Sequence, residues 1–281
     1  MGKASLGRKR FPLDLRLALF EEVLRLKKEY LSYGKIISEI EERHNVTLAK
    51  GTISGWVNGT STPFKAGHVF FPRPTPELAY AIGVKTGDAL LNVKAKTYQY
   101  RIRLQAVDRE FVEAFNRAVA KILGCAPHRL LKGDTAREIH VEFGSYLLHK
   151  FLERPLGELA PFIEHDKRCV AAFLRGFFDS EGSVAVGGSV TASNSSLELL
   201  GYVRLLLSKY FGIETTGPHL YTRKGSLMMR RGRLYRRNVD CFSIYVKRRS
   251  LEKFSEEIGL TIERKSLRLK MALASSKQDF E

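Results

Sequence analysis

Leu78-Ala79-Tyr80-Ala81-Ile82-Gly83-Val84-Lys85-Thr86-Gly87-Asp88 aligns position for position with Ala171-Ala172-Phe173-Leu174-Arg175-Gly176-Phe177-Phe178-Asp179-Ser180-Glu181. Each segment reads as a short apolar helix in which every fourth residue is very small. The small residues are Ala79, Gly83 and Gly87 in the first segment and Ala172, Gly176 and Ser180 in the second. Residues at this spacing share one helical face, and small side chains there let two backbones approach closely. The pattern predicts that the two helices pack against each other along these stripes.

Each segment ends in a carboxylate, Asp88 in the first and Glu181 in the second. Paired helices would bring both acids together, where they repel each other and face negative helix ends. Mg²⁺ prefers oxygen ligands and accepts one or two carboxylates together with water and phosphate. We therefore predict that Asp88 and Glu181 are catalytic metal ligands for Mg²⁺, with Mn²⁺ as an alternative ion. The plainer interpretation is two buried helices that happen to end in acids, and the repetition argues against it.

The segment Leu174–Gly182 resembles the LAGLIDADG motif of homing endonucleases, and Ala81–Ala89 resembles a weaker first copy. The resemblance extends over roughly residues 76–274, and residues 190–219 are similar to the elements that follow the motif in archaeal members. It implies an α+β protein with a pseudo-twofold, duplicated αββαββα fold and curved antiparallel sheets. It also implies a monomeric enzyme that hydrolyses both strands of a long DNA target with divalent metal ions.

The composition favours a polyanionic partner. The 281 residues carry a net charge of +17, with a pI near 9.8, and the basic residues cluster. Double-stranded DNA is the expected partner. The three cysteines lack metal-ligand spacing and read as core thiols of a reducing cytoplasm. No transmembrane span or signal peptide is predicted, and we expect a cytoplasmic protein of prokaryotic, archaeal type.

Residues 1–62 differ from the rest and predict a small all-α domain. Apolar spacing indicates a helix around Ile36 and Ile40, a turn at Val46, and a helix around Ile53 and Trp56, an arrangement that resembles a helix-turn-helix. The face opposite Ile53 would enter a DNA major groove; it carries Lys50, Thr52, Ser54 and Asn58. The alternative is a three-helix packing module without a DNA role. We expect Trp56 to anchor the core under the second helix rather than to stack on bases. Residues 63–75 read as a linker.

Residues 76–165 and 166–281 predict two halves with the same order of elements: helix, two strands, helix, two strands, helix. In the first half, strands span 93–107, Asp108 caps a helix that stops at Gly124, strands lie near 129–131 and 138–143, and a helix spans 146–152. In the second half, strands lie near 184 and 190, Ser195 and Glu198 form a capping box for helix 197–211, a long hairpin spans 215–245, and helices lie near 251–258 and 267–273.

Basic residues on the strands predict the DNA-contacting surface, because Arg and Lys bind phosphates and Arg and Gln can read base edges. In the first half the candidates are Lys94, Lys96, Arg101, Arg103 and Gln105. The hairpin tip of the second half contributes Arg223, Lys224, Arg230, Arg231, Arg233, Arg236 and Arg237. A solvated loop is the alternative interpretation of this charge run.

Three features depart from the family pattern. Ala89 replaces the glycine that usually follows the first acid, and Lys85 and Thr86 are atypical. The strand positions where the family often carries a water-activating lysine hold Val107 and Ser193-Asn194. The sequence therefore leaves three hypotheses open: a homing-type DNA endonuclease, a non-cleaving DNA-binding regulator derived from one, or a maturase that binds intron RNA.

Overall fold

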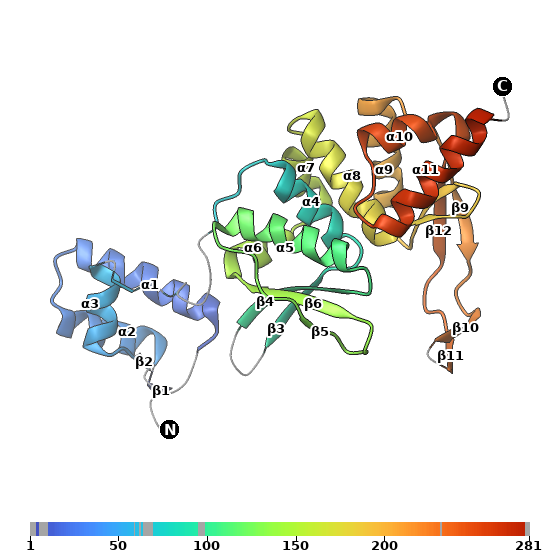
Figure 1. Cartoon of the computed structure of the whole chain (residues 1–281). Coiled ribbons are helices and arrows are strands. Elements are labelled where there is room, and N and C mark those ends of the chain that lie inside the picture. The colour runs from blue at the N-terminus through green and yellow to red at the C-terminus, as the bar shows by residue number, and fades with distance from the viewer. Residues whose placement is uncertain are drawn as a thin grey trace. The chain divides into compact units, whose positions relative to one another are not determined.

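The computed structural model describes residues 4–5, 11–58, 60–61, 63, 70–94, 99–230 and 232–278. The chain divides into two compact units, one made of residues 1–69, 91–102 and 144–149 and the other of residues 70–90, 103–143 and 150–281 (Figure 1). Both predicted halves contribute to the second unit, because the helices that carry the two motif copies pack against each other. None of the helices in the described part of the chain is both long and apolar enough to cross a membrane.

The amino-terminal part contains three helices. They are α1 (Leu13–Lys28), α2 (Tyr33–His44) and α3 (Lys50–Val57), and strand β1 (Ala4–Ser5) pairs in parallel with β2 (Val46–Thr47). The helices predicted on either side of Val46 are therefore present as α2 and α3. Between them Asn45 adopts the left-handed conformation, with φ of 53°, and ends α2. Asn tolerates this conformation better than most residues, which explains the tight turn.

The three helices enclose a core of apolar side chains, and each helix contributes to it. Leu19 and Val23 of α1, Ile36 of α2 and Ile53 of α3 are fully buried. Trp56 is also buried and meets the ring of Phe20 edge-on, with the ring centroids 5.5 Å apart. The prediction that Trp56 anchors a core is confirmed.

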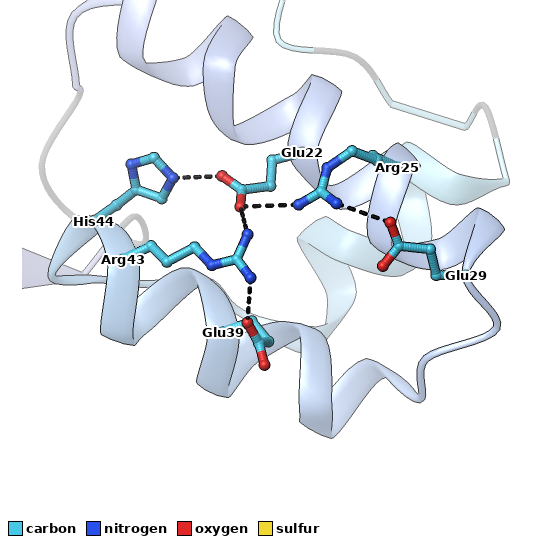
Figure 2. Close-up of polar contacts among 6 residues, drawn as sticks. All are labelled: Glu22, Arg25, Glu29, Glu39, Arg43 and His44. Carbon is cyan, nitrogen blue, oxygen red and sulfur yellow. Dashed lines mark hydrogen bonds and ion pairs between the residues drawn. The ribbon is translucent and has the colours of Figure 1, made fainter.

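Figure 2 shows a polar cluster around Glu22 that ties α1 to α2. The Glu22 carboxylate accepts a hydrogen bond from Arg43 Nη1 at 2.8 Å and lies 2.5 Å from His44 Nε2. Arg43 also binds Glu39 at 2.8 Å, and Arg25 approaches Glu22 at 3.5 Å. Burial alone would raise the pKa of Glu22, but the hydrogen bonds from His44 and Arg43 hold it below its ordinary value.

The larger part of the chain repeats one succession of elements. The first half contains α4 (Pro76–Lys85), β3 (Leu90–Lys94), β4 (Gln99–Ala106), α5 (Arg109–Leu123), β5 (Leu131–Lys132), β6 (Ile139–Gly144), α6 (Tyr146–Leu152) and α7 (Leu156–Ile163). The second half contains α8 (Lys167–Glu181), β7 (Gly182–Val184), β8 (Val190–Asn194), α9 (Leu197–Phe211), β9 (Thr215–Thr222), β10 (Leu227–Arg230), β11 (Arg233–Arg236), β12 (Cys241–Val246), the 3₁₀ turn η1 (Arg248–Ser250), α10 (Leu251–Glu257) and α11 (Glu263–Gln278).

Each half forms a four-stranded sheet with the same topology. The strand orders are β3-β4-β6-β5 and β7-β8-β12-β9, so in both sheets the last strand of the half lies between the second and the third. The registers found for the second sheet are antiparallel, as is the pairing of β5 with β6. Strands β10 and β11 form a separate two-stranded ribbon at the end of the β9–β12 hairpin (Figure 1). The protein is an α+β fold built from a duplicated unit.

Helices α4 and α8 cross in close backbone contact. A Cβ atom at Gly83 would lie 2.2 Å from Phe173 O and 2.9 Å from Phe177 N. A Cβ atom at Gly176 would lie 2.4 Å from Tyr80 O and 3.0 Å from Val84 N. The two sets of contacts are equivalent under the sequence alignment of the motif copies, so the crossing has an internal twofold symmetry. Any side chain larger than glycine at these two positions would force the helices apart.

Several boundaries differ from the predictions. Ser196, rather than Ser195, is the N-cap of α9, and its hydroxyl accepts a hydrogen bond from Leu199 N at 3.1 Å. The predicted Ser195–Glu198 capping box is therefore wrong by one residue. Asp108 stands at the N-cap of α5, but among the described residues its carboxylate binds Arg264 instead of a helix N–H. Helix α7 was not predicted, and α11 begins four residues earlier than expected.

We expect Gly176→Ala to destabilise the fold by about 3 kcal/mol, because the added methyl group would overlap backbone atoms of α4. Gly201→Ala is the matched control in helix α9. Among the described residues no atom lies within 4 Å of the added Cβ there, so better helix propensity should raise stability by roughly 0.5–1 kcal/mol. Chemical denaturation followed by circular dichroism measures both. Equal stabilities of the two variants would contradict close packing of the seam.

We expect Glu22→Gln to lower the free energy of unfolding of the amino-terminal helices by about 1 kcal/mol at neutral pH, because Arg43 and His44 lose a charged partner. The lowered pKa of Glu22 means that its stabilisation is present above the ordinary pKa and is lost as pH falls through the folded value. Hydrogen exchange of α1 and α2 should therefore differ between variant and wild type at pH 7 and converge in acid. Glu21→Gln, on the exposed side of the same turn, should exchange like wild type at both pH values.

Candidate active site

The two predicted catalytic acids lie at the same end of the helix pair. Asp88 follows α4 in a turn where its N–H donates to Val84 O at 3.0 Å, and Glu181 is the last residue of α8. Gly87 marks the contact between the two ends, since a Cβ atom there would lie 2.5 Å from Ser180 Cβ and 3.2 Å from Glu181 Oε1. The close seam thus delivers both carboxylates to one place.

Small residues line the facing stripes of the two helices. Ala79 and Ala172 are buried on the facing stripes, and Ser180 Oγ donates to Gly176 O at 3.0 Å and reaches Val84 O at 3.5 Å. The Ser180 hydroxyl therefore bonds a carbonyl of its own helix and approaches one of the opposite helix. Of the six predicted seam residues, four approach the opposite motif segment: Gly83, Gly87, Gly176 and Ser180.

The surroundings of the acid pair disfavour two negative charges. Burial, and then the charge of Asp88, raise the pKa of Glu181 to about 7. Burial also raises the pKa of Asp88, although this residue keeps an exposed surface through which a ligand can reach it. Lys265 acts in the opposite direction on both carboxyl groups. Raised values of this kind are common where acids are arranged to bind a cation or move a proton.

Asn194 occupies the strand end where the family pattern would have offered a lysine. Its Nδ2 donates to Glu181 Oε1 at 3.1 Å, while its Oδ1 accepts from Ser196 N at 2.9 Å. Asn194 is therefore held in place by the chain and in turn fixes the orientation of the Glu181 carboxylate. Val107, at the corresponding strand end of the first half, is exposed.

A third acid, which is buried, links the two motif helices next to the acid pair. Asp179 accepts hydrogen bonds from Tyr80 Oη of α4 at 3.1 Å and from Thr261 N at 2.8 Å. Burial raises its pKa, and these hydrogen bonds act in the opposite direction. Asp179 thereby links α8 to α4 and to the segment that precedes α11. The alignment of the two motif copies pairs Asp88 with Glu181 and leaves Asp179 opposite Thr86, which agrees with this structural role.

Lys265 is the charged residue of the site that sequence reasoning missed. It belongs to α11, yet its side chain is only 5% exposed, and its Nζ donates to Asp179 O at 2.6 Å and Phe178 O at 3.2 Å. Burial lowers the pKa of Lys265, and the charges of Asp179, Asp108 and Asp88 raise it. No motif spacing points to Lys265, because it lies 84 residues beyond Glu181 on a helix that reads as amphipathic and exposed.

The donor set fits a hard divalent cation. Two carboxylates meet at one end of the seam, and in the described part of the chain no three His, Cys, Asp or Glu side chains form a metal-binding group. Mg²⁺ and Mn²⁺ are commonly held by one or two carboxylates and complete their coordination with water and phosphate oxygens. Burial and then the charge of Asp88 raise the pKa of Glu181, and a bound cation would favour the ionised form of both acids.

The predicted contact residues of the first half alternate along β4 with buried apolar ones. Arg101, Arg103 and Gln105 are half-buried, while Ile102 and Leu104 between them are fully buried. Arg103 binds Gln105 and reaches Asp134 at 3.3 Å, and Gln105 Nε2 donates to Glu138 Oε2 at 3.0 Å. To contact DNA, Arg103 and Gln105 would have to give up these contacts within the protein. Lys96 lies outside the described residues, and the same holds for the side chain of Lys94.

The hairpin of the second half presents an exposed basic edge. Arg223, Lys224 and Arg236 are exposed, Arg237 is partly covered, and Arg236 Nη1 donates to Gly225 O at 3.1 Å. Arg231 and the side chains of Arg230 and Arg233 lie outside the described residues. On α3, Lys50 and Asn58 are exposed, Thr52 and Ser54 are partly covered, and Asn58 Nδ2 donates to Ser54 Oγ at 3.2 Å.

A relative matches nearly the full chain. The uncharacterized protein MJ0398 of Methanocaldococcus jannaschii is 34% identical over 262 residues, which cover 92% of this chain and 94% of that protein. Residues 168–259, which contain the second motif copy and its sheet, match the family of LAGLIDADG-like domains. The chain belongs to the LAGLIDADG family. A second protein from the same archaeon, MJ0314, is 28% identical over 154 residues, or 50% of this chain and 57% of that protein.

Two solved structures show partial similarity to this LAGLIDADG protein. The homing endonuclease I-DmoI, in a complex with DNA and Mn, is 18% identical and gives a TM-score of 0.49, with 66% of this chain and 98% of that chain covered. Full-length DUF199/WhiA from Thermatoga maritima is 16% identical, with a TM-score of 0.46 and coverage of 73% and 63%.

We expect Glu181→Gln to stabilise the metal-free protein in a pH-dependent way. When the pKa of a carboxyl is raised in the folded state, the folded protein becomes less stable as pH rises from the ordinary pKa, 4.5, through the folded pKa, about 7. With a chelator present, the free energy of unfolding of the variant should equal that of wild type near pH 4.5 and exceed it by about 2 kcal/mol at pH 8. Thermal unfolding at the two pH values tests this. Glu256→Gln, an exposed acid on α10, should show no such trend, and a flat difference for Glu181→Gln would contradict the electrostatic account.

Proposed function

We propose that the protein is a site-specific endonuclease that cuts both strands of duplex DNA with divalent metal ions. The observation that carries the proposal is the convergence of Asp88 and Glu181 at one end of a glycine-packed helix seam. Membership in the LAGLIDADG family supports it, as does the net charge of +17. Mg²⁺ is the proposed cofactor, with Mn²⁺ as a substitute.

In this mechanism Asp88 and Glu181 would hold the cation, and the scissile phosphates would supply further oxygen ligands. When bound, such an ion supplies Lewis-acid stabilisation of the phosphoryl oxygens and favours an ionised water. The chain contributes orientation: Asn194 fixes the Glu181 carboxylate, and the Tyr80–Asp179 hydrogen bond keeps the two helix ends in register. Close approach of the helices is needed because the two strands of one duplex must reach one narrow site.

The basic residues of β4 and of the hairpin are proposed to bind the duplex. Arg223, Lys224 and Arg236 are exposed and would bind phosphates, whereas Gln105 and Arg103 are suited to base edges. Helices α2 and α3 are proposed to act as a helix-turn-helix, with Lys50 and Asn58 on the exposed face of α3. A monomer with two unequal halves fits an asymmetric target.

A non-cleaving DNA-binding regulator is the second candidate. The observation that favours it is chemical: the strand ends hold Val107 and Asn194 where the family often has lysine, so water activation lacks its usual base. The relatives reported above give no support to an intron RNA partner.

The deciding experiment begins by selecting bound sequences from a random duplex library with the full chain, and then places the selected site in a plasmid. We expect wild type with Mg²⁺ or Mn²⁺ to linearise the plasmid. Asp88→Asn should slow cleavage by about 100-fold or more, because one cation ligand is lost, while DNA affinity stays within about threefold. Glu256→Gln, which removes an exposed acid, should cleave like wild type.

Two outcomes would argue against the endonuclease. Tight binding of the selected site without strand scission in either metal would favour the regulator. Cleavage that survives in Asp88→Asn and in Glu181→Gln would show that hydrolysis, if intrinsic to the chain, does not use this pair of acids.

A further inference from the structure

The acid pair has a cationic side chain of its own, supplied by the last described helix. Lys265 Nζ donates to two carbonyls in the final turn of α8, at Phe178 and Asp179, three and two residues before Glu181. Its side chain is 5% exposed, so the ammonium group is largely removed from water. A buried charge of this kind needs compensation by nearby opposite charge.

The position of Lys265 is fixed from both halves of the duplicated fold. On the preceding residue, Arg264 Nε and Nη2 bind the two carboxylate oxygens of Asp108 at 2.6 and 2.7 Å, at the start of α5. Thr261 N binds Asp179 of α8, and Glu263 N binds Glu110 of α5. The first turn of α11 is thus anchored to α5 on one side and to α8 on the other, which leaves the Lys265 side chain little freedom.

We propose that Lys265 is the resident cation of the site: its ammonium group balances part of the charge of Asp88 and Glu181 and thereby weakens their affinity for divalent cations until DNA is bound. The inference rests on the proposed metal-binding role of the acid pair but not on cleavage. It makes Lys265 a positioning residue that tunes the charge of the site. The phosphates of bound DNA add negative charge and restore a strong attraction for the metal.

A purely structural role makes a different prediction. A lysine that only caps the negative end of α8 would contribute stability, and its loss would leave metal binding unchanged. A resident cation adds a repulsion between the ammonium group and any metal ion at the acids, and removing it strengthens metal binding. Metal affinity in the absence of DNA therefore separates the two roles.

The test is the affinity of the DNA-free full chain for Mn²⁺, measured by electron paramagnetic resonance of the unbound ion. Lys265→Met should bind Mn²⁺ about tenfold more tightly than wild type, the effect of removing one unit charge near a partly buried site. Arg268→Met is the matched control: it removes a cation from the same helix, one that donates to Val184 O at 3.2 Å, and should bind Mn²⁺ like wild type.

Two further results would decide the matter against the proposal. Equal Mn²⁺ affinity of folded Lys265→Met and wild type would overturn the resident-cation role while leaving the metal site intact. Absence of Mn²⁺ binding in both proteins would contradict the metal site itself, and with it this inference.

The comparison is repeated in a Glu181→Gln background to cover the case in which Lys265→Met alone does not fold. The double variant removes one positive and one negative charge together, so the net charge of the site is kept. It should bind Mn²⁺ more tightly than Glu181→Gln alone, and equal affinities would again overturn the proposal.

Discussion

The packing of α4 against α8 depends on glycine at positions 83 and 176, because glycine has no Cβ atom. Gly83 and Gly176 let the backbones of α4 and α8 approach until a Cβ on either would overlap a carbonyl of the other helix. This close crossing brings Asp88 and Glu181 to a common end of the pair. The contact that packs the two motif helices also sets the position of the proposed metal ligands.

The close approach of the helix ends makes Asp88 and Glu181 repel each other, and several polar contacts reduce this repulsion. The two acids stand at helix ends that already carry partial negative charge. Asn194 donates to Glu181, and Lys265 lowers the pKa of both acids against the effect of burial. Asp179 is satisfied differently, by hydrogen bonds from Tyr80 and Thr261 that act against the effect of burial on its pKa. These contacts offset part of the negative charge of the site, and the part that remains favours binding of a cation.

Local patterns in the sequence were enough to predict the seam, the acid pair, the repeated order of elements and the core position of Trp56, because each depends on residue spacing within one element or on repetition. The site residues Asn194 and Lys265 were out of reach for a physical reason. Their roles arise from contacts between elements distant in the chain, and neither side chain differs in type from residues found on ordinary surfaces. Asp108 shows the same limit: its position predicted a helix cap, but Arg264 from the distant α11 takes its carboxylate.

The anchoring of α11 has a consequence for the order in which the molecule is made. Residues 263–278 leave the ribosome after α4 and α8, so the nascent chain can close its helical pair before the counter-charge of Lys265 exists. Until that segment arrives, the acids face each other with no lysine from α11 beside them. Docking of the first turn of α11 onto α5 and α8 then supplies the anchoring contacts and the lysine charge in one event.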